Sequence, residues 1–325
     1  MTKMDVDRDS IRIACVGECM IELVNRSSKS TWEPHYGGDT LNTCMYLARL
    51  FSEDKDSIYY VTRVGDDPLS KDMAQQWRDE GINCTYVEQI SGRTSGLYLI
   101  TTNLEGERTF FYWRADSPAR ELFSGSNIPI IDILDQMDVV YFSGITLAIL
   151  SDHGRNTLLN KMNTLIKNGK DVVFDINYRD KLWRNHSTAR EWISQALKHT
   201  TLLLPSYDDV RQLFNIVDID SAIRKLRSLT KADIVLKNGG ADIRWVVNDA
   251  QGIIHSSPVD KVVDTPACGD GFNAGYLYAQ TQNMPPQDCI QFADKVARRI
   301  MHFPGAIVPE AQFKDKLSIF RSRIP

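Results

Sequence analysis

Two apolar stretches, Asp138-Val139-Val140-Tyr141-Phe142 and Asp171-Val172-Val173-Phe174-Asp175, enclose the segment that decides the fold of this chain. Between them a helix is predicted to begin at Ser151 and end at Gly169, because apolar side chains recur every three or four residues along one stripe. Two strands joined through a helix are typical of parallel pairing, since the crossover returns the chain to the same end of the sheet. This unit therefore predicts an α/β sheet covered by helices.

The same alternation continues over most of the chain. Strands are expected at residues 11–16, 201–204 and 233–237, and a helix at 66–80 with Pro68 in its first turn. The fold class is therefore α/β, with a mainly parallel central sheet flanked by helices on both faces. Because no repeat or flexible linker marks a boundary, residues 1–325 are expected to form a single domain.

One region breaks this alternation. Residues 94–101 and 107–114 are rich in β-forming side chains and are separated by the turn-like segment 102–106, which predicts a hairpin. Together with the segment around residues 19–36, this hairpin is expected to form a small β-sheet lid. The lid would be discontinuous in sequence, drawn from about 19–36 and 92–115.

Aromatic side chains occupy both faces of the second lid run. Phe110, Tyr112 and Arg114 share one face by the two-residue period of a strand, and Phe111 and Trp113 share the other. One face is therefore expected to pack on protein and the other on a ligand or partner. An exposed aromatic face would suit association between copies, so we expect a homo-oligomer, with the lid as the candidate interface.

The composition favours a cytoplasmic protein that acts on small molecules. Of 325 residues, 42% are hydrophobic and 25% charged, and the net charge is −4, which leaves no basic footprint for nucleic acid or an anionic membrane. The polar residues 1–10 and the short apolar run after them are not expected to form a signal sequence, and no apolar run is long enough to span a bilayer. The six cysteines form no C-x-x-C pair, so reduced thiols are expected.

Residues 264–275 read Asp-Thr-Pro-Ala-Cys-Gly-Asp-Gly-Phe-Asn-Ala-Gly and combine a phosphate cradle with a carboxylate. Small residues at 267–269 let backbone N–H groups approach an anion at the start of the following helix. Asp270 would lie in the first helical turn, where it keeps its charge readily and could accept a proton from an attacking hydroxyl. The alternative is that Asp270 merely caps the helix.

A second glycine pair precedes another helix. Gly37 and Gly38 permit close backbone approach, while Asp39 and Asn42 could grip sugar hydroxyls. A tight turn with an Asp cap is the structural alternative.

Polar residues also follow the predicted strand at 171–175. Asp175 and Asn177 could orient a phosphate or its Mg²⁺ through water, and Arg179 could pair with a carboxylate or phosphate. A solvated loop arginine is the alternative. The turn at 237–242, which contains Lys237, Gly239 and Gly240, is predicted to contact a nucleotide, although a hairpin connection would have the same composition.

Several familiar motifs are missing. No G-x-x-x-x-G-K-[ST] stretch occurs, the glycine spacing at 269–275 does not fit a dinucleotide fingerprint, and no G-x-S-x-G elbow is present. Walker-type ATPases, Rossmann dehydrogenases and α/β-hydrolases are therefore disfavoured.

Taken together, these motifs resemble the ribokinase-like (PfkB) carbohydrate kinases, over nearly the whole chain. The resemblance is strongest to the 2-keto-3-deoxygluconate kinase branch. It rests on five separated stretches: Gly17–Leu23, Gly37–Thr43, Gly106–Arg114, Ser143–Ile145, and Asn177–Arg179 with Leu182 and Trp183.

The resemblance implies a role for each matching position. Asp270 would be the catalytic base, and the backbone of Ala267, Cys268 and Gly269 would form the anion hole for the γ-phosphate. The substrate-binding set would be Gly38, Asp39, Asn42, Tyr98, Tyr112, Arg114, Arg179 and Asp270. The ATP-binding set would be Asn177, Lys237, Gly239, Gly240, Ala267 and Gly269.

The implied activity is ATP-dependent phosphorylation of the 6-hydroxyl of 2-keto-3-deoxy-D-gluconate, giving 2-keto-3-deoxy-6-phosphogluconate. ATP and Mg²⁺ are the implied cofactors, with a monovalent cation such as K⁺ as a further candidate. Two alternatives stay open: a kinase for a neutral ketose such as fructose or tagatose, and a sugar-acid sensor without turnover. Gluconate- and galactonate-derived acids are not separated.

The chain departs from the family pattern at two places. Ala267 and Cys268 stand where the common pattern has Gly and Ala, and the N-x-x-E associated with Mg²⁺ is represented at best by Ser206-Tyr207-Asp208-Asp209. The metal ligands are therefore unassigned. A thiol at a helix N-terminus tends to ionise, so Cys268 is either a redox-sensitive group or an inert buried thiol.

Overall fold

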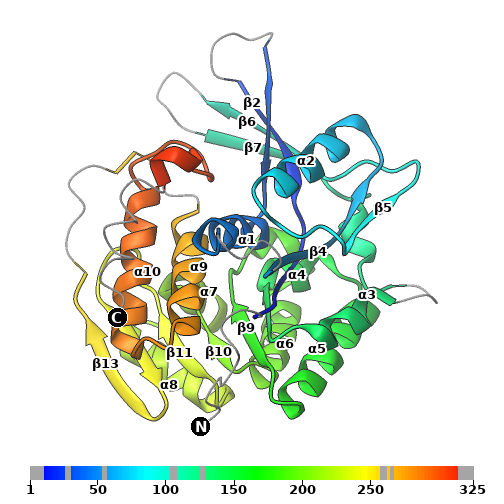
Figure 1. The fold of residues 1–325 in the computed structure, drawn as a ribbon. Helices are drawn as coiled ribbons and strands as arrows, with labels where there is room; N and C mark the ends of the chain where they lie inside the picture. Colours follow the sequence, from blue (N-terminus) through cyan, green and yellow to red (C-terminus); the bar gives the residue numbers. More distant parts are fainter. Residues whose placement is uncertain are drawn as a thin grey trace.

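The structure is a computed structural model that describes residues 11–25, 31–52, 57–102, 108–124, 129–256, 262–263 and 267–313. Within these residues, nine strands form one sheet in the order β13-β12-β11-β10-β9-β8-β1-β4-β5 (Figure 1). Their bounds are β1 (Ile13–Val16), β4 (Ile58–Gly65), β5 (Val87–Ile90), β8 (Val139–Ser143), β9 (Asp171–Asp175), β10 (Leu202–Leu203), β11 (Asp233–Leu236), β12 (Ile243–Val247) and β13 (Ala250–Ile254). The pairs from β11 to β5 are parallel, and β12 and β13 add an antiparallel extension.

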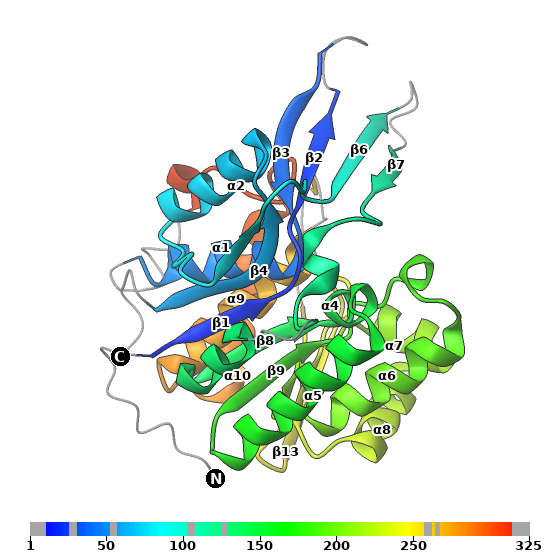
Figure 2. The ribbon, with the colours of Figure 1, turned by 90° about the vertical axis from the view of Figure 1, so that its right-hand side faces the viewer.

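Helices cover both faces of this sheet, as Figure 2 shows. One face carries α1 (Asp39–Leu50), α2 (Pro68–Asp79), α9 (Cys268–Thr281) and α10 (Pro286–Ile300). The other carries α3 (Pro129–Asp132), α4 (Gly144–Ile149), α5 (Asp152–Lys167), α6 (His186–Lys198), α7 (Tyr207–Phe214) and α8 (Ile219–Leu229).

The main sheet has a hydrophobic core on each face, and strand β1 contributes side chains to both. Ile13 and Cys15 pack into the core beneath α1 and α9, and Ala14 and Val16 pack into the opposite core. Because successive side chains of a strand point to opposite faces, a central strand covered on both sides must be apolar throughout. All six cysteines lie within the described residues, and no disulfide joins any two of them there.

The unit that decides the fold forms as predicted. Ser151 caps α5 by accepting a hydrogen bond from the N–H of Gly154 over 3.1 Å, and Gly169, at φ +77°, lies just after its end. The strands on either side, β8 and β9, pair in parallel. The strand expected at 201–204 is shorter than predicted, because only Leu202 and Leu203 pair with both neighbours.

A separate sheet of four strands stands above the first, in the order β3-β2-β6-β7 (Figures 1 and 2). Its strands are β2 (Met20–Val24), β3 (Glu33–Gly37), β6 (Leu97–Thr102) and β7 (Arg108–Trp113). The predicted hairpin is confirmed by the antiparallel pairing of β6 with β7, and its connecting residues 103–107 lie outside the described part. We call this sheet the lid; β2 and β6 pair in parallel at its centre.

Candidate active site

The predicted site residues gather where the carboxyl ends of the parallel strands meet the lid. Ser143 ends β8, Asp175 ends β9, and Lys237 follows β11, so all three lie at one edge of the main sheet. Helices α1 and α9 begin at the same edge. Ligands of open α/β sheets bind at this edge, because the connecting loops there can present side chains without disturbing the core.

Helix α9 begins with an N-terminus suited to an anion. Its N-cap is Ala267, whose methyl group cannot accept a hydrogen bond from the first turn, and the first intrahelical bond runs from the N–H of Gly271 to the carbonyl of Ala267 over 2.9 Å. The N–H groups before Gly271 therefore have no acceptor within the helix. Gly269 is exposed, while Cys268 and Asp270 on either side are buried. Residues 264–266 of the predicted cradle lie outside the described residues.

Asp270 lies in the first turn of α9, as predicted, but its charge does not follow the prediction. Its side chain is buried, with the residue only 7% exposed, and Asn42 donates to its Oδ2 from Nδ2 over 2.8 Å. Burial and the neighbouring Asp39 carboxylate raise the pKa of Asp270 well above its usual range, and the bond from Asn42 only partly opposes this. The expectation that a helix N-terminus would keep this carboxyl readily charged is therefore wrong.

The start of α1 lies against the start of α9. Asn177 donates from Nδ2 to Oδ2 of Asp39 over 2.7 Å, and burial raises the pKa of Asp39 although Ser143 and Asn177 bond to its carboxylate. The two residues predicted to bind sugar hydroxyls therefore already form hydrogen bonds within the protein. Asp39 bonds to Asn177, and Asn42 bonds to Asp270. One acceptor remains, because the buried Oδ1 of Asn42 has no partner among the described residues.

Gly38, the N-cap of α1, is needed for close packing. A Cβ at this position would lie 2.2 Å from the carbonyl oxygen of Glu18 and 3.1 Å from Cα of Cys19. Both neighbours are backbone atoms that cannot rotate away, so any side chain here would displace the loop between β1 and β2.

A buried polar network lies behind the N-terminus of α9. Nζ of Lys237 donates to Oδ2 of Asp175 over 2.9 Å and to Oδ1 of Asn273 over 2.8 Å. Asn273 in turn donates to Asp175 and to the hydroxyl of Tyr141. Asp175, which is predicted to orient a phosphate or Mg²⁺ through water, is the buried counter-ion of Lys237 in this structure. Nζ of Lys237 would lie 3.6 Å from a Cβ placed on Gly269, so its positive charge borders the predicted anion hole.

The turn at 237–242 connects β11 to the antiparallel strand β12, so it is a hairpin connection. Gly239 and Gly240 have φ values of +55° and +89°, the left-handed region that favours glycine. Its two glycines are exposed, at the same edge as Asp175.

Three predicted substrate residues lie on the lid. The rings of Tyr98 and Tyr112 stack with centroids 5.7 Å apart, and the hydroxyl of Tyr98 donates to Glu22. Burial and the Glu22 carboxylate raise the pKa of Tyr98, which keeps it a neutral donor. Arg114, just after β7, forms a buried ion pair with Glu18.

Arg179 lies in the loop after β9, not on the lid. Its side chain is 55% exposed and contacts Asp209 over 3.5 Å. Asp209 belongs to the stretch that stands for the family N-x-x-E, and there Ser206 caps α7 by accepting from the N–H of Asp209 over 3.1 Å. Burial and the nearby Asp175 raise the pKa of Asp209 to about 6.

The described residues do not fit a metal ion held by protein ligands. No group of three or more His, Cys, Asp or Glu side chains converges on one point in this part of the chain. Asp175 is neutralised by Lys237, and Asp209 accepts hydrogen bonds from Ser206 and from the backbone of Tyr178. A protein cage for Mg²⁺ is therefore not formed by these carboxylates.

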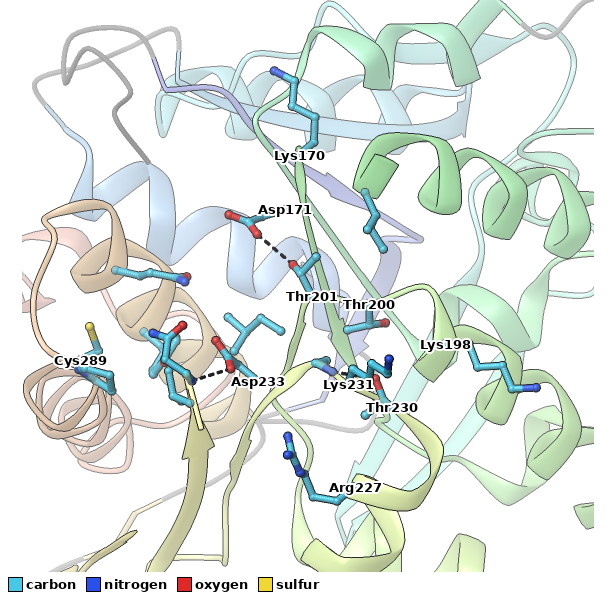
Figure 3. A pocket seen from close by; sticks show the side chains of 18 of the residues that line it. Lys170, Asp171, Lys198, Thr200, Thr201, Arg227, Thr230, Lys231, Asp233 and Cys289 are labelled. Atoms are coloured by element: carbon cyan, nitrogen blue, oxygen red, sulfur yellow. Dashed lines mark hydrogen bonds between the residues drawn. The ribbon is translucent and has the colours of Figure 1, made fainter. Parts of the chain in front are cut away.

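A cavity of about 960 Å³ lies at the opposite edge of the sheet, at the starts of β9, β10 and β11 (Figure 3). There Thr201 donates to Asp171 over 3.0 Å, and the N–H of Asn248 donates to Asp233 over 2.9 Å. None of the predicted site residues lines this cavity. In the described part of the chain, no helix is both long and apolar enough to cross a membrane.

Three residues of the site were given no role of their own from the sequence, although each lies in a stretch quoted above: Glu18 in Gly17–Leu23, Ser143 in Ser143–Ile145 and Asn273 in residues 264–275. Asn273 lies three residues after Asp270 in α9, so the two side chains are neighbours on one side of the helix. Ser143 ends a predicted strand, and Glu18 follows the first strand directly, so strand-end position was the available signal.

Comparison with known proteins gives consistent matches over the whole described fold. The model of the pfkB family carbohydrate kinases matches residues 10–312. The 2-dehydro-3-deoxygluconokinase of Haemophilus influenzae is 36% identical over 312 residues, covering 95% of this chain and 99% of that protein. The enzyme of the same name from Escherichia coli K12 is 34% identical over 305 residues, covering 92% and 98%.

Two solved structures show the same fold. The PfkB protein from Polaromonas sp. JS666 superposes with a TM-score of 0.80 at 20% identity, over 94% of this chain and all of that one. A putative ribokinase II from E. coli, solved in complex with ATP and Mg²⁺, gives a TM-score of 0.80 at 17% identity, over 97% of this chain and 100% of that one. The predicted α/β class, the mainly parallel sheet and the separate lid are thereby confirmed.

Proposed function

The chain belongs to the pfkB family of carbohydrate kinases, and we propose that it transfers the γ-phosphoryl group of ATP to the 6-hydroxyl of 2-keto-3-deoxy-D-gluconate. The product would be 2-keto-3-deoxy-6-phosphogluconate. Support for this substrate comes from relatives at 34–36% identity that carry the corresponding name.

The proposed chemistry depends on Asp270. It is a buried carboxyl in the first turn of α9, whose N-cap residue, Ala267, has no side-chain acceptor, so the acceptor hydroxyl and the phosphate can meet there. The 6-hydroxyl oxygen attacks the γ-phosphorus, its proton passes to Asp270, and the bond to the ADP oxygen breaks. A pKa raised by burial brings the base closer to the operating pH, which favours general base catalysis.

Backbone N–H groups at 267–270 would stabilise charge on the transferred phosphoryl group. They are fixed by the helix, so no reorganisation is needed when charge develops. The positive charge of Lys237 borders the same position. We propose that Asn177, Lys237 and the glycine turn at 239–240 contact the nucleotide.

Recognition of the sugar acid is proposed for Arg114 and Arg179, with Gly38, Tyr98 and Tyr112 completing the pocket. A 2-keto-3-deoxy aldonate carries a carboxylate that a neutral ketose lacks, and a guanidinium binds a carboxylate through charge-assisted hydrogen bonds. Each such bond is worth about 1.5–3 kcal/mol, which is enough to discriminate against fructose or tagatose.

Mg²⁺ is expected to arrive with the nucleotide. This ion keeps several waters and commonly binds phosphates with one or two carboxylates, so a dedicated protein cage is not required. It would neutralise charge on the phosphates when bound, while the residues above orient the acceptor and take up its proton.

An ADP-release assay tests this function. Purified protein is given MgATP with 2-keto-3-deoxygluconate, its galactonate-derived epimer, fructose or tagatose. Efficient turnover of a 2-keto-3-deoxy acid, with little turnover of the ketoses, is expected. Preference for a ketose would make the protein a neutral-sugar kinase, and calorimetric binding of the acid without ADP release would make it a sensor.

We also propose that copies of the chain associate through the lid. Phe111 and Trp113 are 47% and 60% exposed on the same face of β7, which is unusual for aromatic side chains. Sedimentation at increasing protein concentration is expected to show an oligomer that Trp113→Lys dissociates. A monomer at every concentration would contradict this.

A further inference from the structure

Glu18 lies beside all four segments that connect the lid to the main sheet. It follows β1 and precedes β2, whereas Gly38 follows β3, Gly96 precedes β6 and Arg114 follows β7. A Cβ on Gly38 would lie 2.2 Å from the backbone oxygen of Glu18, and one on Gly96 would lie 2.9 Å from its Oε1. The four connections are therefore packed around this one residue.

The ion pair between Glu18 and Arg114 is buried and incomplete. The two side chains are 1% and 11% exposed, and Nη2 of Arg114 donates to Oε2 of Glu18. Oε1 of Glu18 and Nε of Arg114 have no partner within the described residues. A guanidinium has five N–H groups in a rigid fork, so a single bond to Glu18 leaves others for a second acceptor.

We propose that Glu18 is a positioning residue for Arg114. Its carboxylate holds the guanidinium from the buried side and directs the remaining N–H groups toward the carboxylate of the sugar acid. The side chain of Glu18 is 1% exposed and already bonded to Arg114, so its proposed action is through Arg114 and not through contact with the substrate. This inference rests on the proposed function, because it assigns Arg114 to the acid group.

Recognition of the acid group therefore depends on Glu18, which lies where the lid joins the main sheet. Without an anchor, a long arginine side chain would sample several rotamers, and ordering it would weaken substrate binding. Glu18 removes that cost in advance, and its charge also balances the buried cation. Substrate affinity should therefore fall when the anchor is lost, while the chemical step, at Asp270, should be little changed.

Steady-state kinetics of Glu18 variants test this inference. The substrates are 2-keto-3-deoxygluconate and 3-deoxyfructose, which differ only at C1, where the ketose has a hydroxymethyl group in place of the carboxylate. Glu18→Ala is expected to raise KM for the acid about tenfold or more, with kcat within about threefold and KM for the ketose little changed. Glu18→Gln keeps an acceptor oxygen in place and should restore most of the affinity.

The matched control is Glu80→Gln, which weakens the buried ion pair of Glu80 with Arg49 away from the site. It should lower the melting temperature without changing KM. If Glu18→Ala does not fold, Glu18→Asp, which withdraws the carboxylate by one methylene, should raise KM for the acid about fivefold.

Three results would overturn the inference. They are an unchanged KM for the acid in the folded variant, an equal rise for acid and ketose, and tighter acid binding by Glu18→Gln, which would make Glu18 a competing anion. If the wild-type protein does not phosphorylate 2-keto-3-deoxygluconate at all, the proposed function fails instead. The wild-type assay therefore separates the two failures.

Discussion

Asn42 donates through Nδ2 to Oδ2 of Asp270 over 2.8 Å, which joins the starts of α1 and α9 across 228 positions of the chain. A second bond, from the hydroxyl of Thr43 to the carbonyl of Asp270, strengthens this junction. The carboxyl is thus fixed in direction before any substrate binds. Positioning of this kind matters in phosphoryl transfer, where catalysis rests largely on geometry and electrostatics.

Replacement of Asp270 by Asn should abolish most turnover and leave binding intact. General base catalysis contributes about 10²–10⁴ in rate, so kcat should fall by roughly that factor, while the Kd of the sugar acid stays within about threefold. Single-turnover kinetics and calorimetry measure the two quantities. Asp288→Asn, in the exposed first turn of α10, is the matched control. Near-normal kcat in Asp270→Asn would remove Asp270 from its catalytic role.

The same variant should be more stable than the wild type as pH rises. The pKa of Asp270 is raised in the folded protein, so the folded state binds this proton more tightly than the unfolded chain does. Folding stability is then lost as pH rises from the ordinary carboxyl range through the raised pKa. Asp270→Asn removes this loss, so the melting temperature of the variant should exceed that of the wild type by an amount that grows as pH rises above the ordinary carboxyl range, about pH 4. A difference independent of pH would contradict the assignment.

Arg114→Gln should change substrate preference more than catalysis. Loss of a charge-assisted hydrogen bond worth about 1.5–3 kcal/mol corresponds to a rise in KM for the sugar acid of roughly 10- to 150-fold. KM for 3-deoxyfructose should change by less than about threefold, because this ketose has no carboxylate. Arg63→Gln, which disrupts an ion pair with Glu88, is the control. Equal losses for both substrates would show that Arg114 does not select the acid.

Lys237→Met should destabilise the protein strongly. It leaves the Asp175 carboxylate buried without its cation, and removal of one partner of a buried pair costs about 3–5 kcal/mol. The double variant with Asp175→Asn should recover part of this loss, because the uncompensated charge is gone. Urea unfolding of the four proteins in this cycle gives the coupling energy directly. Additive losses would show that the pair does not interact.

The fold followed from the sequence wherever one local rule decided the outcome. The stripe between Ser151 and Gly169, with a cap at one end and a left-handed glycine after the other, needed no knowledge of distant residues. The hairpin of β6 and β7 was predictable for the same reason, from two β-rich runs around a polar turn. Strand β10 was overestimated, because the length of a pairing depends on both neighbours.

The sequence predicted where the site lies, but not which of its side chains contact one another. Strand ends and glycine turns indicated the edge where Asp175, Asn177 and Lys237 lie. That Lys237 neutralises Asp175 depends on two segments 62 residues apart, and no local pattern encodes that contact. The raised pKa of Asp270 likewise depends on burial and on Asp39, which only the folded chain brings near.

The lid leaves and rejoins the main sheet twice, through four connections that pass Glu18. An exchange of lids between related kinases would therefore need two inserts and four junctions made together, since one insert would carry only half of the sheet. The parallel pairing of β2 with β6 joins these halves, so each insert would have to match the other in register. New substrate specificity is thus expected to arise more readily by point changes on an existing lid than by transplanting a new one.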